Sequence, residues 1–178
     1  MTSRDGLTFN RWPEAFVRPG LQRIRWYFRH NLVCNALLVT ASHIPGTPDE
    51  LSLYSTEDNF LGKSDRIRRF TIRVDGFVSI KAPMRGGEMV TKPLVFAGEA
   101  LVINFSTSAA GSVRVEIQDA SSRPVPGFTL AESTEIFGDQ IERVVQWQDG
   151  RDLSKLAGKP VRLRFVLKDA DVFSIQFR

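Results

Sequence analysis

Apolar and polar residues alternate at every second position in several segments of the chain from residue 70 onward. A period of two predicts strands with one buried face, because successive side chains of a strand point to opposite faces of a sheet. The segments that show the pattern are 70–74, 101–105, 113–117, 161–167 and 173–177. The alternation therefore predicts an all-β chain with very little helix.

Turn-forming residues separate the predicted strands at the intervals expected for a β-sandwich or barrel. Asp75-Gly76 predicts a type I′ hairpin, because that turn needs positive φ at both central residues. The one predicted helical stretch is a single turn at 152–157, with Asp152 as N-cap and Gly158 at its C-terminal end. Further turns are predicted at Gly86-Gly87, Ala110-Gly111, Pro126-Gly127 and 168–171.

Composition and charge narrow the class of protein. The 178 residues are 42% hydrophobic and 25% charged, as in a globular chain, and the longest apolar runs are strand-sized, so no membrane partner is expected. The polar N-terminus does not resemble a secretory signal, so we expect the chain as given to remain in the cytoplasm.

The net charge of +4 raises the possibility of a nucleic-acid partner. Most basic residues alternate with apolar ones and are interleaved with acids, which is typical of solvated strand faces. One denser group is a candidate contact for an anionic partner, but no nucleic-acid motif accompanies it, and we expect no nucleic-acid partner. This group comprises Arg18, Arg23, Arg25 and Arg29, beside the aromatic residues 26–28.

Four segments of the later half carry a family resemblance: residues 91–96 (TKPLVF), 100–119 (ALVINFSTSAAGSVRVEIQD), 126–128 (PGF) and 156–165 (LAGKPVRLRF). Together they resemble the C-terminal β-sandwich that follows a five-bladed propeller in bacterial proteins similar to invertase- and levanase-type glycoside hydrolases. Residues 3–9, with an Asp5-Gly6 turn, resemble a propeller hairpin. Residues 51–54, followed by 68–77, resemble the last blade leading into the sandwich.

The resemblance implies two parts. Residues 1–76 would form a partial propeller-blade-like segment, and residues 77–178 an antiparallel, jelly-roll-like β-sandwich. In that family the catalytic carboxylates come from early propeller blades, which would precede Met1. The resemblance therefore implies a chain that is no enzyme on its own, either the tail of a longer glycoside hydrolase-like protein or the product of a shortened reading frame.

The residues themselves predict no catalytic group. Glycoside hydrolysis needs two carboxyl groups across a sugar, one with a raised pKa in an apolar cleft. The acidic pairs all lie in polar, turn-like stretches, where solvated carboxylates are expected: Asp49/Glu50, Glu57/Asp58, Glu132/Glu135 and Asp169/Asp171.

Cofactor sites are also not predicted. His30 and His43 are too few for a zinc site, which needs three or four ligands at recognisable spacing. A structural Ca²⁺ ion stays open, because backbone carbonyls can supply its ligands. We interpret the single Cys34, among apolar neighbours, as a small buried residue.

Exposed aromatic rings are the candidates for sugar recognition, because pyranose C–H faces stack on them. The candidate residues are Trp26, Tyr27, Trp12 and Trp147. Trp147 follows Val144 and Val145, and a tryptophan in this context more often fills the interior of a sandwich. Trp26 and Tyr27, which are flanked by Arg25 and Arg29, are the better candidates for exposed stacking.

Three functions remain open. The first is a structural accessory module that packs on a propeller domain, and the second is a carbohydrate-binding module that uses the exposed aromatics. The third is a self-associating β domain, in which the unpaired strand edges of an incomplete blade pair with a second copy.

Overall fold

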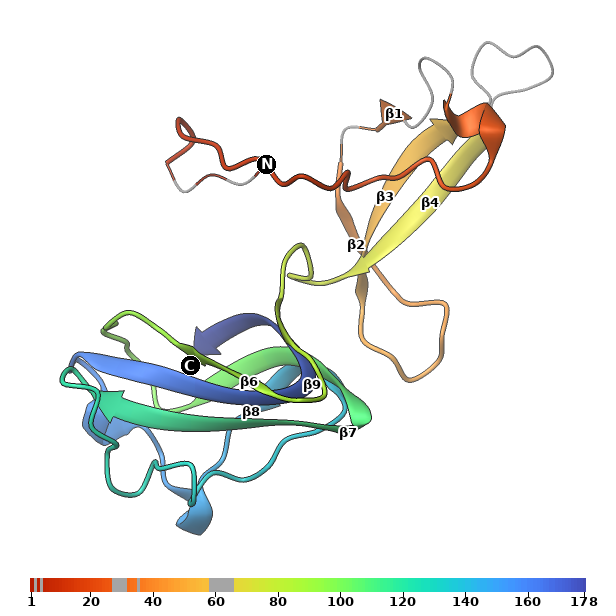
Figure 1. Cartoon of the computed structure of the whole chain (residues 1–178). Helices are drawn as coiled ribbons and strands as arrows, with labels where there is room; N and C mark the ends of the chain where they lie inside the picture. Colours follow the sequence, from red (N-terminus) through yellow and green to blue (C-terminus); the bar gives the residue numbers. More distant parts are fainter. Residues whose placement is uncertain (2, 4, 27–31, 35, 58–65) are drawn as a thin grey trace. The chain divides into compact units, whose positions relative to one another are not determined.

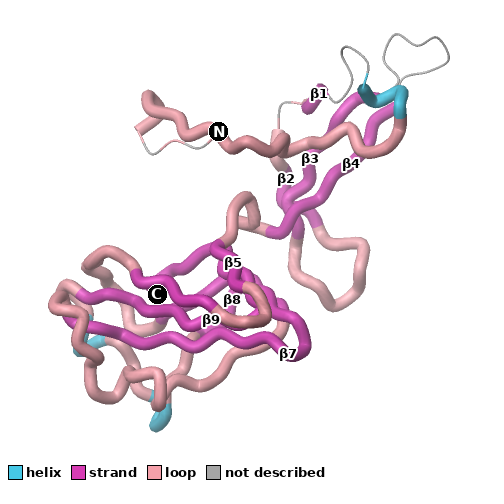
Figure 2. Tube along the Cα trace, viewed as in Figure 1, coloured by secondary structure: helices cyan, strands magenta, loops and turns pink. Residues whose placement is uncertain are grey.

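The computed structural model describes residues 1, 3, 5–26, 32–34, 36–57 and 66–178 (Figure 1). Within these residues the fold is all-β, with two antiparallel sheets and only short 3-10 turns (Figure 2). The chain divides into two compact units. Unit 1 comprises Met1–Thr40 and Leu51–Thr71, and unit 2 comprises Ala41–Glu50 and Ile72–Arg178.

The first sheet contains four strands, and most of it belongs to unit 1. Strand β3 (Glu50–Glu57) pairs with β1 (Leu32–Val33), β2 (Leu38–Thr40) and β4 (Arg66–Arg73). A 3-10 turn, η1, spans Arg23–Trp26. Leu53 is the one buried large apolar side chain in the described part of unit 1. This unit therefore has little hydrophobic core of its own.

The second sheet belongs to unit 2 and has the order β5-β9-β7-β8, with β6 also paired to β9. Its two long strands, β7 and β9, run antiparallel to each other along their length. The bounds are Ile80–Ala82 for β5, Gly87–Val90 for β6, Leu101–Asp119 for β7, Asp139–Val144 for β8 and Val161–Phe177 for β9.

The core of unit 2 confirms the predicted alternation on β9, where every second residue from Val161 to Leu167 is buried. On β7 the apolar positions are buried as predicted, but residues 101–105 and Glu116 are all buried, so the polar face is covered there as well. Aromatic pairs extend this core. Phe96 stacks on Phe177 with ring centroids 4.1 Å apart, and Phe128 meets Trp147 edge to face at 5.3 Å. The side chains buried from the two long strands include Leu101, Ile103, Phe105, Val113, Val115, Ile117, Val161, Leu163, Phe165 and Leu167.

Two predicted turns lie inside continuous strands instead. Ala110-Gly111 falls within β7, and residues 168–171 fall within β9. The register passes from Thr107↔Ala170 to Ser112↔Lys168, so residues 108–111 lie opposite Asp169. A bulge of this kind bends a strand without ending it. The turn-forming residues therefore mark a bend, because the ladder resumes on both sides.

The predicted type I′ hairpin at Asp75-Gly76 is wrong, although a turn is present. The Gly76 N–H donates to the Arg73 carbonyl oxygen at 3.0 Å, and Asp75 has a φ of 54°. Gly76 does not have positive φ. The strands on the two sides do not pair with each other, because β4 pairs with β3 and β5 pairs with β9.

Other local predictions hold. The turns at Gly86 and Gly127 are present, with φ values of 86° and 92°. The helical turn predicted over 152–157 is present in a shorter form, the 3-10 turn η3 (Ser154–Leu156). Its N-cap residue is Leu153 and not the predicted Asp152, whose carboxylate accepts a hydrogen bond of 3.0 Å from the Ser154 N–H. A further 3-10 turn, η2, spans Gln148–Gly150.

Two expectations for the first half of the chain are not met. Among residues 3 and 5–9 the structure has a bend in place of a hairpin, in which the Asp5 carboxylate accepts hydrogen bonds from the Leu7 and Thr8 N–H groups at 2.9 and 2.7 Å. Cys34, expected to be buried, is exposed, because the short strand β1 beside it has both side chains at the surface.

Candidate functional site

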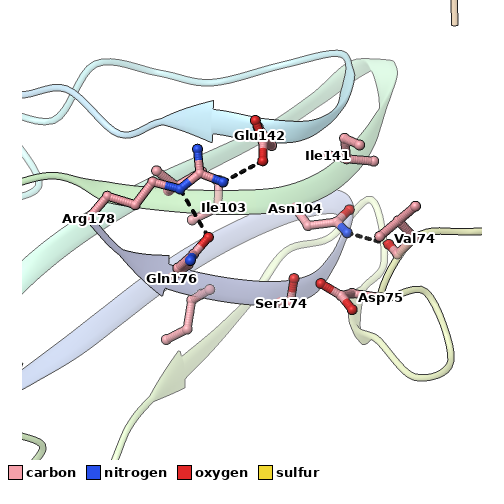
Figure 3. A pocket seen from close by; sticks show the side chains of 11 residues that line it. Val74, Asp75, Ile103, Asn104, Ile141, Glu142, Ser174, Gln176 and Arg178 are labelled. Atoms are coloured by element: carbon pink, nitrogen blue, oxygen red, sulfur yellow. Dashed lines mark hydrogen bonds and ion pairs between the residues drawn. The ribbon is translucent and has the colours of Figure 1, made fainter. Parts of the chain in front are cut away.

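A cleft of about 290 Å³ lies in unit 2, between the turn after β4 and the end of the chain (Figure 3). Its floor comes from β7 and β9, and β8 contributes one side. The lining residues are Val74, Asp75, Val102, Ile103, Asn104, Ile141, Glu142, Ser174, Ile175, Gln176 and Arg178.

Asn104 attaches the turn after β4 to the sheet. Its side chain is 3% exposed and uses both ends of the amide. Oδ1 accepts a hydrogen bond of 2.9 Å from Arg73 Nε, and Nδ2 donates one of 2.7 Å to the Val74 carbonyl oxygen. These bonds hold the backbone on the N-terminal side of Asp75 and so place Asp75 at the rim of the cleft.

Arg73 is itself fixed on several sides. Its guanidinium donates to the Phe105 carbonyl oxygen at 3.3 Å and pairs with the Asp139 carboxylate at 2.7 Å. The Arg73 Cζ atom also lies 4.4 Å from the centre of the Phe173 ring, as in a cation–π contact. Such a multiply bonded arginine makes the turn a rigid part of unit 2.

The opposite side of the cleft is formed by an ion pair. The Arg178 guanidinium donates to the Glu142 carboxylate, and its Nε donates to Gln176 Oε1 at 3.1 Å (Figure 3). The hydrogen bond from Arg178 lowers the pKa of Glu142 and raises the pKa of Arg178. Both groups are therefore charged at neutral pH, and their charges compensate each other.

Three polar groups of the cleft are not used in the fold. Asp75 is exposed, and its carboxylate accepts no hydrogen bond from the described residues. The Ser174 hydroxyl and Gln176 Nε2 also make no hydrogen bond with any of the described residues. The cleft thus offers an acceptor, a hydroxyl and an amide donor to a ligand.

The three described aromatic residues predicted as sugar-binding sites, Trp12, Trp26 and Trp147, do not line this cleft. Trp26 is 70% exposed, and its indole N–H donates to the Gly20 carbonyl oxygen at 2.9 Å. Trp12 is 48% exposed. Both belong to unit 1. Tyr27 lies outside the described residues.

Trp147 lies in the core, the place that its apolar neighbours in the sequence favour. It is 2% exposed, and its indole N–H donates to the Val115 carbonyl oxygen at 2.9 Å. A second hollow of about 280 Å³ borders it, between the β8–η2 segment and residues 99–101. Because protein atoms cover the ring, Trp147 does not present a stacking surface in this structure.

The acidic residues that we considered for catalysis are held as carboxylates where they are described. The hydrogen bond from Arg68, at 2.5 Å, lowers the pKa of Glu57. The Thr129 hydroxyl, at 2.8 Å, lowers the pKa of Glu132. The general acid of a glycoside hydrolase needs the opposite shift. Asp58, the partner of Glu57, lies outside the described residues.

Of the remaining predicted acids, Asp49 is exposed and Glu50 and Asp169 are half-buried. Glu135 pairs with Arg114 at 2.7 Å, and Asp171 accepts a hydrogen bond from Ser79 at 2.7 Å. Across the described ranges, no three His, Cys, Asp or Glu side chains come together in a way that could hold a metal ion. No helix within them has the length and apolar character of a membrane span.

Comparison with known proteins finds no matching family model, no matching curated protein and no matching solved structure. The cleft therefore has to be interpreted from its own residues. The sequence alone does not indicate that the polar groups of the cleft converge. Its pattern places Asp75 in a turn, and Ser174 and Gln176 on the polar face of a strand. Their convergence depends on the pairing of β7 with β9, which no local signal shows.

Proposed function

We propose that this chain is a non-catalytic, structural accessory β portion of a glycoside hydrolase-like protein. In this proposal residues 1–76, which include all of unit 1, form the propeller-blade-like segment that packs against a propeller domain, and residues 77–178 form the jelly-roll-like β-sandwich. The observation that carries the proposal is the large amount of apolar surface on unit 1. The exposed large apolar side chains in its described part are Met1, Leu7, Phe9, Trp12, Phe16, Leu21, Trp26, Leu32, Val33, Leu37, Leu38, Val39 and Ile67.

The contrast between the units supports this reading. Unit 2 buries a full set of apolar residues, whereas unit 1 buries Leu53 alone among its described large apolar side chains. Exposed apolar surface of this extent is typical of a protein–protein contact. Four antiparallel strands in one sheet also match the size of a propeller blade, whose faces are covered by neighbouring blades.

Two measurements test the proposal. The chain alone should release no product from sucrose, a fructan or aryl glycosides, and turnover that is lost on changing an acidic residue would refute the accessory role. The genomic DNA directly upstream should encode an in-frame propeller. An upstream frame that encodes another kind of domain would refute the propeller as the partner.

The apolar contact surface can be probed with a fluorescent dye that binds apolar patches. We expect Val39→Ser to lower the bound-dye fluorescence, because Val39 lies in the exposed part of unit 1. Val95→Ser is the matched control, since Val95 is equally exposed but belongs to unit 2. Equal effects of the two changes would contradict a special role for unit 1.

A second candidate function is carbohydrate binding through exposed aromatics. The observation that favours it is the exposure of Trp26 and Trp12, with the Trp26 indole held by its hydrogen bond to Gly20. Titration with oligosaccharides should then change the tryptophan fluorescence, and Trp26→Ala should weaken binding. Phe137→Ala, at an exposed aromatic residue of unit 2, is the control. Binding that survives the Trp26 and Trp12 changes would refute this candidate.

A further inference from the structure

The cleft beside Asp75 carries hydrogen-bonding groups of complementary kinds. A carboxylate only accepts hydrogen bonds, a hydroxyl both donates and accepts, and a primary amide nitrogen donates. Asp75, Ser174 and Gln176 supply these three groups. Sugar hydroxyls need both kinds of partner, because each of them can donate and accept at the same time.

These groups are held in place before any ligand arrives. Ser174 and Gln176 are two residues apart on β9, so their side chains share one face of the sheet. Asp75 is positioned by the turn that Asn104 and Arg73 fix to that sheet. Binding groups that are already ordered cost less conformational entropy when they meet a ligand.

Apolar surface lies among the polar groups. Val102 is opposite Gln176 in the register of β7 and β9, and Ile141 lines the side formed by β8. A sugar ring has apolar C–H faces as well as hydroxyls, so it fits a surface of mixed character. The cleft, at about 290 Å³, is at the small end of ligand sites, which fits a single ring.

Other ligand classes fit less well. An anion would need an uncompensated cation, but Arg178 is bound by Glu142, and Asp75 adds negative charge. A metal ion would need a third ligand, and within the described residues no such group is found. A flat aromatic ligand would need an aromatic wall, and no aromatic side chain from the described part of the chain lines the cleft.

We propose that this cleft binds one residue of a neutral, polyhydroxylated sugar, with Asp75 and Ser174 as hydroxyl partners and Gln176 as a donor. All of these residues belong to unit 2. The proposal therefore does not depend on the packing of unit 1, nor on Trp12 or Trp26. If the sugar site in the cleft fails its test, the proposed accessory role can still be tested, and the reverse also holds.

The test is a titration of the ¹⁵N-labelled chain, followed by its amide resonances. The probes are the methyl glycosides of glucose and galactose, fructose and sucrose. They are raised to about 50 mM, because a single small ligand is expected to bind with a Kd of about 1 mM or weaker. We expect at least one probe to shift the amides of Asp75, Ser174 and Gln176 in a saturating way.

Two variants and one control sharpen the result. Asp75→Asn keeps the left-handed backbone, which asparagine tolerates, but replaces a charged acceptor by a neutral one. We expect it to raise the Kd about tenfold, and Ser174→Ala to raise it as well. Asp149→Asn should leave the Kd unchanged, because Asp149 is also exposed with positive φ but does not line the cleft.

Three results would overturn the inference. The first is the absence of saturating shifts at the cleft for every probe. The second is an Asp75→Asn chain that binds as tightly as the unchanged protein. The third is a set of shifts confined to Trp12 and Trp26, which would assign sugar binding to the exposed aromatics of unit 1 instead.

Discussion

Arg73 donates through Nε to Oδ1 of Asn104, and the same amide donates through Nδ2 to the Val74 carbonyl oxygen. One buried amide thus joins the chain leaving β4 to the central strand β7. Because both of its polar ends are occupied inside the protein, its removal leaves two groups without a partner.

We therefore expect Asn104→Ala to destabilise unit 2 by about 1–3 kcal/mol, since a buried donor and acceptor lose their partners. Chemical denaturation followed by circular dichroism measures the change. Gln146→Ala, at an exposed residue, is the control and should change stability little. An Asn104→Ala chain as stable as this control would show that the turn is held by other contacts.

The core of unit 2 should be sensitive to cavities. Phe165 is fully buried on β9, so Phe165→Ala is expected to cost about 3–5 kcal/mol. Phe137 is 72% exposed in the same unit, and Phe137→Ala should cost less than about 0.5 kcal/mol. Similar losses for both variants in thermal unfolding would contradict the assignment of the core.

Glu132 should make stability depend on pH. The Thr129 hydroxyl and N–H and the Gly127 N–H donate to its carboxylate, and they lower its pKa from the ordinary value of 4.5. A lowered pKa in the folded state stabilises the fold above pH 4.5 and loses this effect as the pH falls through the folded value.

The measurement compares the Tm of the unchanged protein with that of Glu132→Gln between pH 7 and pH 3. We expect the unchanged protein to have the higher Tm at pH 7, and the difference to shrink below pH 4.5. A difference that stays constant over the whole range would show that the ionised form of Glu132 contributes nothing.

Cys34 should react with a thiol reagent in the native protein, because its side chain is exposed. A disulfide-exchange reagent that releases a coloured product should modify one thiol per chain without denaturant. Cys34→Ser is the control and removes the signal. A thiol that reacts only after unfolding would contradict the exposed position.

The strands of unit 2 could be predicted because burial follows the same period as the backbone. Leu163, Phe165 and Leu167 are buried in alternation on β9, and the predicted Leu101, Ile103 and Phe105 are buried on β7, although Val102 and Asn104 between them are buried too. The bend at residues 108–111 could not be told from a turn. Glycine and aspartate permit both, and the choice depends on whether the partner strand continues.

The cleft could not be predicted from the sequence, for a different reason. Asp75 and Ser174 are far apart in the chain and meet only because Asn104 fixes the turn beside β9. The local context of the tryptophans, in contrast, was informative. The apolar neighbours Val144 and Val145 favoured the core for Trp147, which is buried, and the flanking Arg25 and Arg29 favoured the surface for Trp26, which is exposed.

The position of β9 has a consequence for synthesis on the ribosome. This strand pairs with β5, β6 and β7, which are synthesised before it. Their pairing with β9 can therefore form only after β9 has left the ribosomal exit tunnel. Pairing over such sequence distances slows folding and leaves unpaired edges open in the meantime. Nascent chains of this protein should therefore depend on chaperones until Phe177 has emerged.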